Sequence, residues 1–244
     1  MKALVLAAGK STRIAVRASG LPKPLIAVNG TPIILRTLEW LVVHDISPIW
    51  INLHYKPDSI RDTVTGSQYA DADIRFSHER EILGTAGAVK NLEAEWTEPF
   101  LLVYGDNLLG FDIAEMVASH RASESALTMA LFHWETDLHS QIAGGRVECD
   151  EAMRVTDFTE GAVAGRVDSP WVNAGVYVVD PVVLGEIPSG VFFDFGRDLF
   201  PALLRKGSVL HGYPINSYCL AADTPDALDI AERQMRKRDR ATAR

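Results

Sequence analysis

The sequence predicts an α/β fold with a doubly wound, mostly parallel sheet, and two observations support this prediction. Short β-rich runs alternate with amphipathic stretches through the first half of the chain, which is the pattern of βαβ units. Hydrophobic residues make up 47% of the 244 residues and charged residues 23%, the balance of an ordinary globular protein. Ligands of doubly wound folds bind beyond the carboxyl ends of the strands.

The elements of the first half follow one another in a regular order. The expected strands cover residues 3–8, 48–53, 73–77 and 100–103, which are rich in apolar and β-branched side chains. The expected helices cover residues 32–44, 58–65, 85–92 and 113–120, which are amphipathic.

The pattern changes after residue 125. Strands are expected at 126–132, 172–179 and near 208–213, a hairpin at 145–149 and 153–158, and helices at 194–204 and 224–237. The last helix begins with Thr-Pro, which suits the N-cap and N1 positions. We therefore expect one Rossmann-like domain over residues 1–244, with a mixed sheet that gains an antiparallel extension in its second half.

Charge and cysteine usage narrow the classes of partner and the compartment. A net charge of -8 disfavours a nucleic-acid partner, and we interpret the basic residues at 233–244 as the solvated end of a helix. Cys149 and Cys219 show no metal-type spacing, which predicts reduced thiols and a cytoplasmic protein. No apolar run approaches the ~20 residues of a membrane span, so no membrane partner is expected. A homo-oligomer is left open.

The stretch LVLAAGKSTR at residues 4–13 is a candidate phosphate-binding loop. A P-loop would need a glycine where Leu4 stands, and a dinucleotide fingerprint would need glycines besides Gly9, so neither motif is present. What remains is a strand that runs into small residues, Ala7 and Ala8, whose backbone a ligand can approach closely. Successive amides in such a loop suit an anion.

Two cations accompany this loop. Arg13 offers a guanidinium that can bind phosphate oxygens in a bidentate manner. Lys23 lies in LPKPL, where Pro22 and Pro24 restrict the backbone. An isolated lysine or arginine is usually a solvated surface charge, but the rigid setting of Lys23 favours a functional role.

Several motifs in series resemble those of the sugar-1-phosphate nucleotidylyltransferases. LAAGKSTR followed by PKPLIAVNGTPII resembles the family signature L-A-[AG]-G-x-G-T-R and P-K-P-[LM]. Further matches follow in order: LGTAGAV at 83–89, VYGDNL at 103–108, VNAGVYVV at 172–179, DFGRDLFPALL at 194–204 and DTPDAL at 223–228. The resemblance covers most of the chain.

The resemblance implies attack of a sugar phosphate oxygen on the α-phosphorus of a nucleoside triphosphate, with release of pyrophosphate. A phosphate monoester carries about -1.5 to -2 charge, so its oxygen is already ionised and catalysis rests on positioning and charge neutralisation. By resemblance, residues 1–125 form the nucleotide-binding half and residues 126–244 the acceptor-binding half. Arg13 and Lys23 are then the catalytic residues.

The resemblance also assigns binding and metal residues. Asp106, in GDN at the end of an apolar run, would bind Mg²⁺, although the same tripeptide suits a plain turn. The implied nucleotide contacts are Leu6, Ala7, Ala8, Gly9, Gly84, Thr85 and Gly87, and the implied acceptor contacts are Asn173 and Gly175. Gly84 and Gly87 could instead belong to a glycine-rich helix start. Asn173 could instead form its hydrogen bonds with neighbouring residues of its strand.

Two positions depart from the family pattern. Relatives often carry D-I-G-T-P, whereas this chain has Ala221 at the aspartate position, so we expect Asp223 to supply the second metal carboxylate. Relatives also carry a lysine on the acceptor phosphate where this chain has Gly161, and Arg166 is the candidate replacement.

The substrates stay open between related alternatives. The motifs favour GTP with a heptose or mannose type 1-phosphate, with UTP or CTP and a cyclitol phosphate also considered. A cytidylyltransferase for phosphocholine is the second hypothesis, with Trp134 and Trp171 as candidates for binding the quaternary amine. The third is a nucleotide-sugar sensor without turnover, suggested by Ala221 and Gly161.

Overall fold

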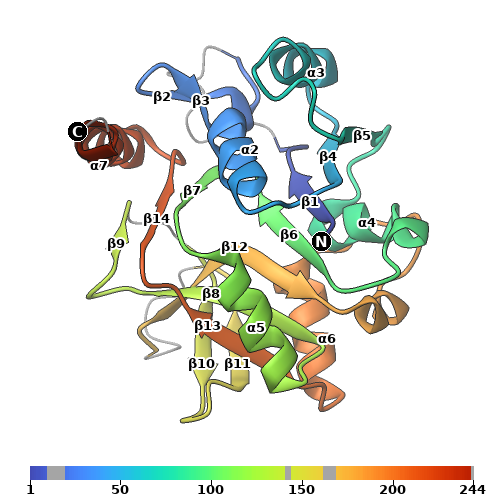
Figure 1. The fold of residues 1–244 in the computed structure, drawn as a ribbon. Helices are drawn as coiled ribbons and strands as arrows, with labels where there is room; N and C mark the ends of the chain where they lie inside the picture. Colours follow the sequence, from blue (N-terminus) through green and yellow to red (C-terminus); the bar gives the residue numbers. More distant parts are fainter. Residues whose placement is uncertain (10–19, 141–143, 162–168, 243–244) are drawn as a thin grey trace.

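Residues 1–9, 20–140, 144–161 and 169–242 are described by the computed structural model, and their centre is a mixed sheet of nine strands (Figure 1). Four parallel strands lie in the order β6-β1-β4-β5. Their bounds are β1 Ala3–Leu6, β4 Ile49–Leu53, β5 Ile74–His78 and β6 Phe100–Tyr104. The predicted parallel half is confirmed.

The second half of the chain continues this sheet beyond β6. Strand β12 (Trp171–Val179) runs antiparallel to β6, to β8 (Leu127–His133) and to β10 (Arg146–Cys149). Strand β11 (Val155–Thr159) forms the predicted hairpin with β10, and β13 (Leu210–Pro214) pairs in parallel with β8. The predicted antiparallel extension is therefore present, with one parallel pair in it.

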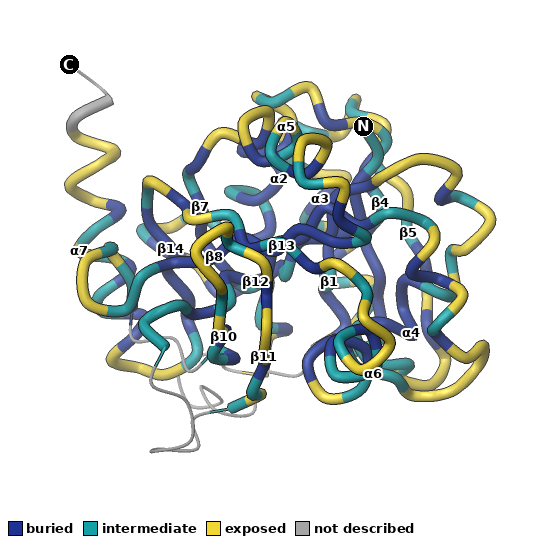
Figure 2. Tube along the Cα trace, turned by 90° about the horizontal axis from the view of Figure 1, so that it is seen from below, coloured by how far each residue is buried: buried dark blue, intermediate teal, exposed yellow. Residues whose placement is uncertain are grey.

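Helices cover both faces of the sheet (Figure 2). Helices α2 (Ile33–Val43), α3 (Pro57–Thr65) and α5 (Ile113–Ser123) pack on one face. Helices α4 (Gly84–Lys90) and α6 (Phe200–Arg205) pack on the other. The two helical layers enclose strands that Figure 2 shows dark blue, which is the doubly wound arrangement.

Successive side chains along each strand contribute in turn to the two hydrophobic cores, one on each face of the sheet. In β1, Ala3 and Val5 belong to the core under α2, whereas Leu4 belongs to the core under α4. Successive side chains of a strand point to opposite faces, so a continuous apolar run is required where both faces are covered.

A second, smaller sheet was not predicted. Strand β14 (Tyr218–Ala221) pairs antiparallel with β7 (Asn107–Leu109) and parallel with β9 (Leu138–His139). Strands of two to four residues are too short to show a period of two in the sequence, so the prediction recognised only the larger sheet. A hairpin of β2 (Ala27–Val28) and β3 (Thr31–Pro32) also escaped prediction for this reason.

The last helix, α7 (Pro225–Thr242), begins as the sequence predicts. The Thr224 hydroxyl oxygen accepts a hydrogen bond from the Ala227 amide at 3.2 Å, which is an N-cap interaction. Residues 236–240 are exposed, as expected for the basic end of a surface helix, and the Arg238 guanidinium lies 4.3 Å from the ring centroid of Tyr218 (Figure 2). None of the helices in the described ranges is long and apolar enough to cross a membrane.

The helix predicted at 194–204 is interrupted. A π-helical turn at Phe195–Leu199 precedes α6, and the Asp194 side chain caps it by accepting hydrogen bonds from the amides of Gly196 and Arg197 at 3.0 and 3.2 Å. Three short 3₁₀ turns complete the described elements, at Lys23–Leu25, Glu93–Glu95 and Pro181–Glu186.

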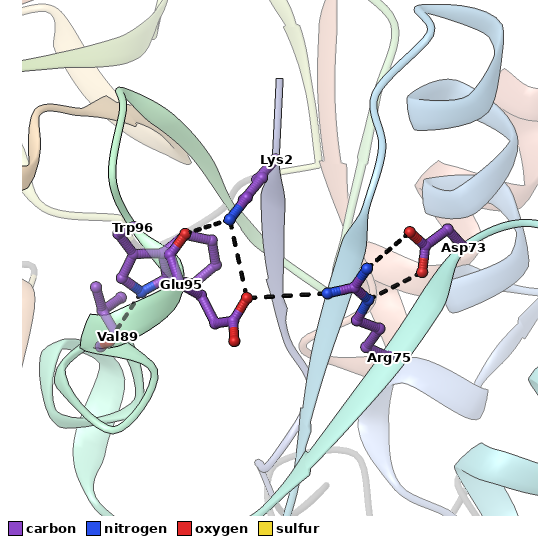
Figure 3. A network of polar contacts seen from close by, with 6 residues as sticks. All are labelled: Lys2, Asp73, Arg75, Val89, Glu95 and Trp96. Carbon is purple, nitrogen blue, oxygen red and sulfur yellow. Dashed lines mark hydrogen bonds and ion pairs between the residues drawn. The ribbon is translucent and has the colours of Figure 1, made fainter.

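A polar network ties the amino ends of the parallel strands together (Figure 3). The Lys2 ammonium donates to the Glu95 carbonyl at 2.5 Å and lies 3.8 Å from the Glu95 carboxylate. Arg75 lies 3.9 Å from the same carboxylate and donates to Asp73 at 2.9 and 3.0 Å. The opposite end of these strands carries the candidate site.

Candidate functional site

Three charged side chains from distant segments meet at the carboxyl end of the parallel strands. The Lys23 ammonium contacts a carboxylate oxygen of Asp106 and one of Asp223. All three side chains are largely buried, with exposed fractions of 12% for Lys23, 25% for Asp106 and 14% for Asp223. The structure thus brings together one predicted catalytic residue and both predicted metal ligands.

Strand pairing explains why these residues meet. Leu6 of β1 aligns with Tyr104 of β6, so the turn that holds Asp106 lies beside the residues that follow β1. Asn107 of β7 aligns with Ala221 of β14, which brings Asp106 close to Asp223. Lys23 lies in the turn between two prolines that the sequence singled out.

The carboxylates determine the charge state of Lys23. Burial is the largest single influence and lowers the pKa of Lys23, but the charges and hydrogen bonds of Asp106 and Asp223 raise it more. The net pKa lies above its ordinary value, so the group is an ammonium at neutral pH.

A cavity of about 270 Å³ opens beside this cluster. Of the predicted nucleotide contacts and metal ligands, Leu6, Ala8, Gly9, Gly84, Thr85 and Asp106 line it. It is also lined by side chains that the sequence reasoning missed, namely Asn52, Glu79, Ile82, Tyr104, Phe192 and Asp194. Most of these residues lie at or just beyond the carboxyl ends of the parallel strands, as expected for a doubly wound sheet, whereas Phe192 and Asp194 come from the segment before the π-helical turn.

A buried chain of hydrogen bonds forms one wall of the cavity. The Asn52 side-chain oxygen accepts from the Ala7 amide at 2.7 Å, and its nitrogen donates to Glu79 Oε1 at 2.7 Å. Glu79 Oε2 accepts from the Leu83 amide at 3.1 Å, and Glu79 is 3% exposed. The Ala7 amide is thus engaged by Asn52. The sequence could have indicated this wall, because Asn52 and Glu79 are polar residues at the carboxyl ends of strands β4 and β5.

The other wall is organised by Thr85 and Asp194. The Thr85 hydroxyl donates to Asp194 Oδ2 at 2.9 Å and accepts from the Phe195 amide at 2.8 Å. This pair of hydrogen bonds joins the start of α4 to the start of the π-helical turn. Motifs more than a hundred residues apart therefore share one wall.

The glycines of LGTAGAV lie in the first turn of α4 and allow the backbone at 191–193 to pack closely against it. Gly84 has φ +74°, and a Cβ there would lie 2.6 Å from the Phe193 carbonyl oxygen. A Cβ at Gly87 would lie 2.9 Å from the Val191 carbonyl oxygen, and Gly87 does not line the cavity. The space above these glycines is taken by the protein's own backbone, so a nucleotide role for Gly87 stays a prediction.

The predicted acceptor residues lie in a bulge of β12. Asn173 donates to the Tyr177 hydroxyl at 2.6 Å and accepts from the Gly175 amide at 3.0 Å, so its side chain is satisfied locally. Gly175 has φ +74°, and a Cβ there would lie 2.9 Å from Asn107 Nδ2. Neither residue lines the cavity, and their contact with an acceptor stays a prediction.

Arg13, predicted to be catalytic, and Arg166, the candidate replacement for a lysine, lie outside the residues that the structure describes. Gly161, which stands where relatives carry a lysine, has φ +76°. The neighbouring Glu160 carboxylate fills the space where a Cβ at Gly196 would lie. Burial, followed by the charge of Asp194, raises the pKa of Glu160, while Arg197 opposes this shift.

The donor set beside Lys23 fits a hard divalent cation. Among the described residues, no group of three or more His, Cys, Asp or Glu side chains could hold a metal ion. Asp106 and Asp223 supply two carboxylates, and Mg²⁺ is usually bound through one or two carboxylates together with substrate phosphates and water. The ammonium between them shows that this position attracts a cation.

Comparisons with known proteins place the chain among relatives of similar sequence. The chain is 30% identical over 228 residues to a UTP–glucose-1-phosphate uridylyltransferase of Synechocystis, covering 88% of this chain and 58% of the relative. It is 30% identical over 226 residues to a mannose-1-phosphate guanylyltransferase of Mycobacterium tuberculosis, covering 92% of this chain and 61% of the relative. The chain thus spans about three fifths of the length of these curated relatives.

A solved structure shares the fold. HddC from Yersinia pseudotuberculosis, in a crystal structure with GMP-PN, superposes with a TM-score of 0.80 at 23% identity, covering 96% of this chain and 99% of that chain. The model of the family described as "Nucleotidyl transferase" matches residues 2–218. With its fold, its site motifs and its relatives in agreement, the chain belongs to the nucleotidyl transferase family.

Proposed function

We propose that this chain transfers a nucleoside monophosphate from a nucleoside triphosphate to a sugar 1-phosphate, releasing pyrophosphate and forming a nucleoside diphosphate sugar. The observation that carries the proposal is the meeting of Lys23, Asp106 and Asp223 beside a cavity at the carboxyl ends of the parallel strands. The activities named for the two curated relatives support the class of reaction.

The residues divide the work as the chemistry requires. The acceptor phosphate is ionised at neutral pH, so repulsion between two polyanions is the main obstacle and a general base is not needed. Lys23 and Arg13 neutralise phosphate charge, and the backbone around Gly9 approaches the triphosphate closely. Residues 1–125 hold the nucleotide, and residues 126–244 hold the acceptor.

Asp106 and Asp223 would hold Mg²⁺. Nucleotidyl transferases generally use a divalent metal. When bound, such an ion supplies positive charge to the phosphate oxygens and helps to orient them. The turn after β6 and the segment before α7 hold these two carboxylates in place as ligands.

We further propose GTP as the preferred nucleotide, because a buried carboxylate lines the cavity. Glu79 accepts one hydrogen bond on each oxygen from within the protein, and a carboxylate has about four acceptor positions. Guanine presents two neighbouring donors, its ring N–H and its exocyclic amino group, which a carboxylate can bind together. Uracil offers one donor between two carbonyl oxygens, which a carboxylate would repel.

A phosphocholine acceptor receives less support from the side chains that would bind it. The guanidinium of Arg146 already lies 4.6 Å from the ring centroid of Trp134. Trp171 packs edge-on against His133, with ring centroids 5.1 Å apart. Neither tryptophan lines the cavity, so a sugar 1-phosphate is the acceptor that we favour.

Pyrophosphate release tests the proposal directly. The protein is incubated with Mg²⁺ and each of GTP, UTP, CTP, ATP and dTTP, paired with mannose, heptose and glucose 1-phosphates, inositol phosphate and phosphocholine. We expect GTP with a mannose or heptose 1-phosphate to be fastest. If the protein binds nucleotide but releases pyrophosphate with none of the pairs, the proposed transferase activity is wrong. The hypothesis of a nucleotide-sugar sensor would then remain.

A further inference from the structure

The position between the two aspartates is already held by a cation of the protein itself. The Lys23 ammonium contacts Asp106 and Asp223 at once, and its side chain is only 12% exposed. We infer that Lys23 is an internal substitute for the metal: it occupies the carboxylates in the free protein and leaves them when a triphosphate arrives. The metal then binds with the nucleotide and not before it. This inference rests on the proposed function.

Contact geometry makes the two cations exclusive. The ammonium lies against Asp106 Oδ2 and Asp223 Oδ1, and a divalent ion that bridges the two carboxylates through these oxygens would lie about 2.0–2.1 Å from each, in the case of Mg²⁺. It would therefore lie where the ammonium now lies, and two like charges at that separation repel strongly. Asp106 and Asp223 can hold Lys23 or the metal in this position, but not both.

The surroundings allow Lys23 to move its head group without moving its backbone. In the 3₁₀ turn Lys23–Leu25, Pro24 and Leu25 are buried, and Pro22 and Pro24 restrict the backbone dihedral angles. The four-carbon stem of a lysine is flexible, so the ammonium alone can change partner. Asp106 also lines the cavity, so a polyanion bound there would lie within reach of the ammonium.

Charge balance explains why the nucleotide is needed. In the free protein, two carboxylates face one ammonium, and removal of that ammonium leaves two negative charges close together in a largely buried place. A metal alone would displace the Lys23 ammonium from both aspartates, and the other carboxylates that line the cavity, Glu79 and Asp194, already accept hydrogen bonds from within the protein. A triphosphate offers Lys23 new anionic oxygens and supplies the remaining ligands of the metal.

Binding of Mn²⁺ to the protein without nucleotide tests this inference. Electron paramagnetic resonance measures free Mn²⁺ over a titration of wild type, Lys23→Met and the control Lys90→Met, which removes an ammonium paired with Glu93. We expect Lys23→Met to bind Mn²⁺ at least tenfold more tightly than wild type, and Lys90→Met to match wild type. Adding Asp106→Asn to Lys23→Met should abolish the gain. Lys23→Gln, whose amide can still donate to a carboxylate, replaces Lys23→Met if that variant does not fold.

The outcomes separate this inference from the proposed function. Mn²⁺ binding by free wild type as tight as by the Lys23 variants would overturn the inference, and so would the absence of any gain in both variants. A parallel titration of wild type with GTP present reports on the metal site itself. If Mn²⁺ binds wild type only with GTP, the inference and the proposed site both stand; if Mn²⁺ does not bind even then, the proposed metal site is wrong.

Discussion

Lys23, Asp106 and Asp223 show how a site is assembled from single residues that are weak signals alone. Each could be a solvated charge or a turn residue when read in isolation. Their contact in the structure, together with their burial, makes a purely solvated role untenable for any of them. Their proposed chemistry can be tested one side chain at a time.

Asp106→Asn should nearly abolish turnover while the protein still folds. The amide keeps the size of the side chain but removes the charge that would hold a divalent ion, and we expect kcat to fall at least about 100-fold. Pyrophosphate release measures activity, and circular dichroism checks the fold. Asp58→Asn, on a carboxylate 86% exposed, is the matched control. Activity close to that of wild type would remove Asp106 from the metal site.

Glu79→Gln should change the choice of nucleotide. Glutamine keeps one oxygen that can accept the hydrogen bond from Asn52 or Leu83, but it cannot accept both donors of guanine. The lost interaction corresponds to about 1.5–3 kcal/mol of transition-state stabilisation. We expect kcat/KM to fall about 10- to 150-fold for GTP and less for UTP. Glu81→Gln changes an exposed carboxylate two residues away and should leave both values unchanged. An equal fall for all nucleotides would show that Glu79 has a structural role alone.

Elements fit together through close backbone contacts at the cavity. The start of α4 and the segment at 191–193 are joined by hydrogen bonds from the Ala86 and Gly87 amides to the Phe193 carbonyl, both 3.0 Å long. The Phe193 amide in turn donates to the Leu83 carbonyl at 2.8 Å. The glycines of LGTAGAV allow this approach, which links the two halves of the chain.

Gly84→Ala should destabilise the protein by about 2 kcal/mol. The positive φ of +74° disfavours alanine, and its Cβ would lie 2.6 Å from a carbonyl oxygen that the helix start holds in place. Urea unfolding followed by circular dichroism measures the change. Gly185→Ala, with no atom within 4 Å of its Cβ and no positive φ, should change stability little. Equal effects of the two substitutions would contradict the packing role.

At the scale of the whole molecule, two tyrosines join the parallel and antiparallel parts of the sheet, Tyr177 fully buried and Tyr104 half-buried. Tyr104 of β6 and Tyr177 of β12 pack edge to face, with ring centroids 5.8 Å apart. Burial, the largest cause, raises the pKa of both phenols above the ordinary value of 10.0. The folded protein therefore keeps both protonated where the unfolded chain would lose their protons.

The free energy of unfolding should fall as the pH rises above about 10. Below that value neither state ionises these phenols, so their contribution is complete; above it only the unfolded state releases protons, at about 1.4 kcal/mol per pH unit for each tyrosine. Urea unfolding across this range measures the slope. Tyr177→Phe should remove one tyrosine's share of the slope, whereas an unchanged slope would place the loss of stability on other groups.

The sequence by itself determined the parallel strands, most helices, the N-cap of α7 and the motif loops, because period, caps and turn chemistry are local properties. It also pointed to Asp223 as the second carboxylate, through a displaced motif. Those features required no knowledge of which distant segments would touch.

Only the tertiary structure decided which side chains share the site. The sheet of β7, β14 and β9 is too short to read from a period, yet its pairing brings Asp106 to Asp223. Asn52 and Glu79 became part of a cavity wall because parallel neighbours end at the same edge of the sheet. Asn173 forms hydrogen bonds with neighbours at a bulge, and Lys23 contacts two carboxylates. The pairing of distant strands sets the distances between these side chains, and no local sequence pattern records it.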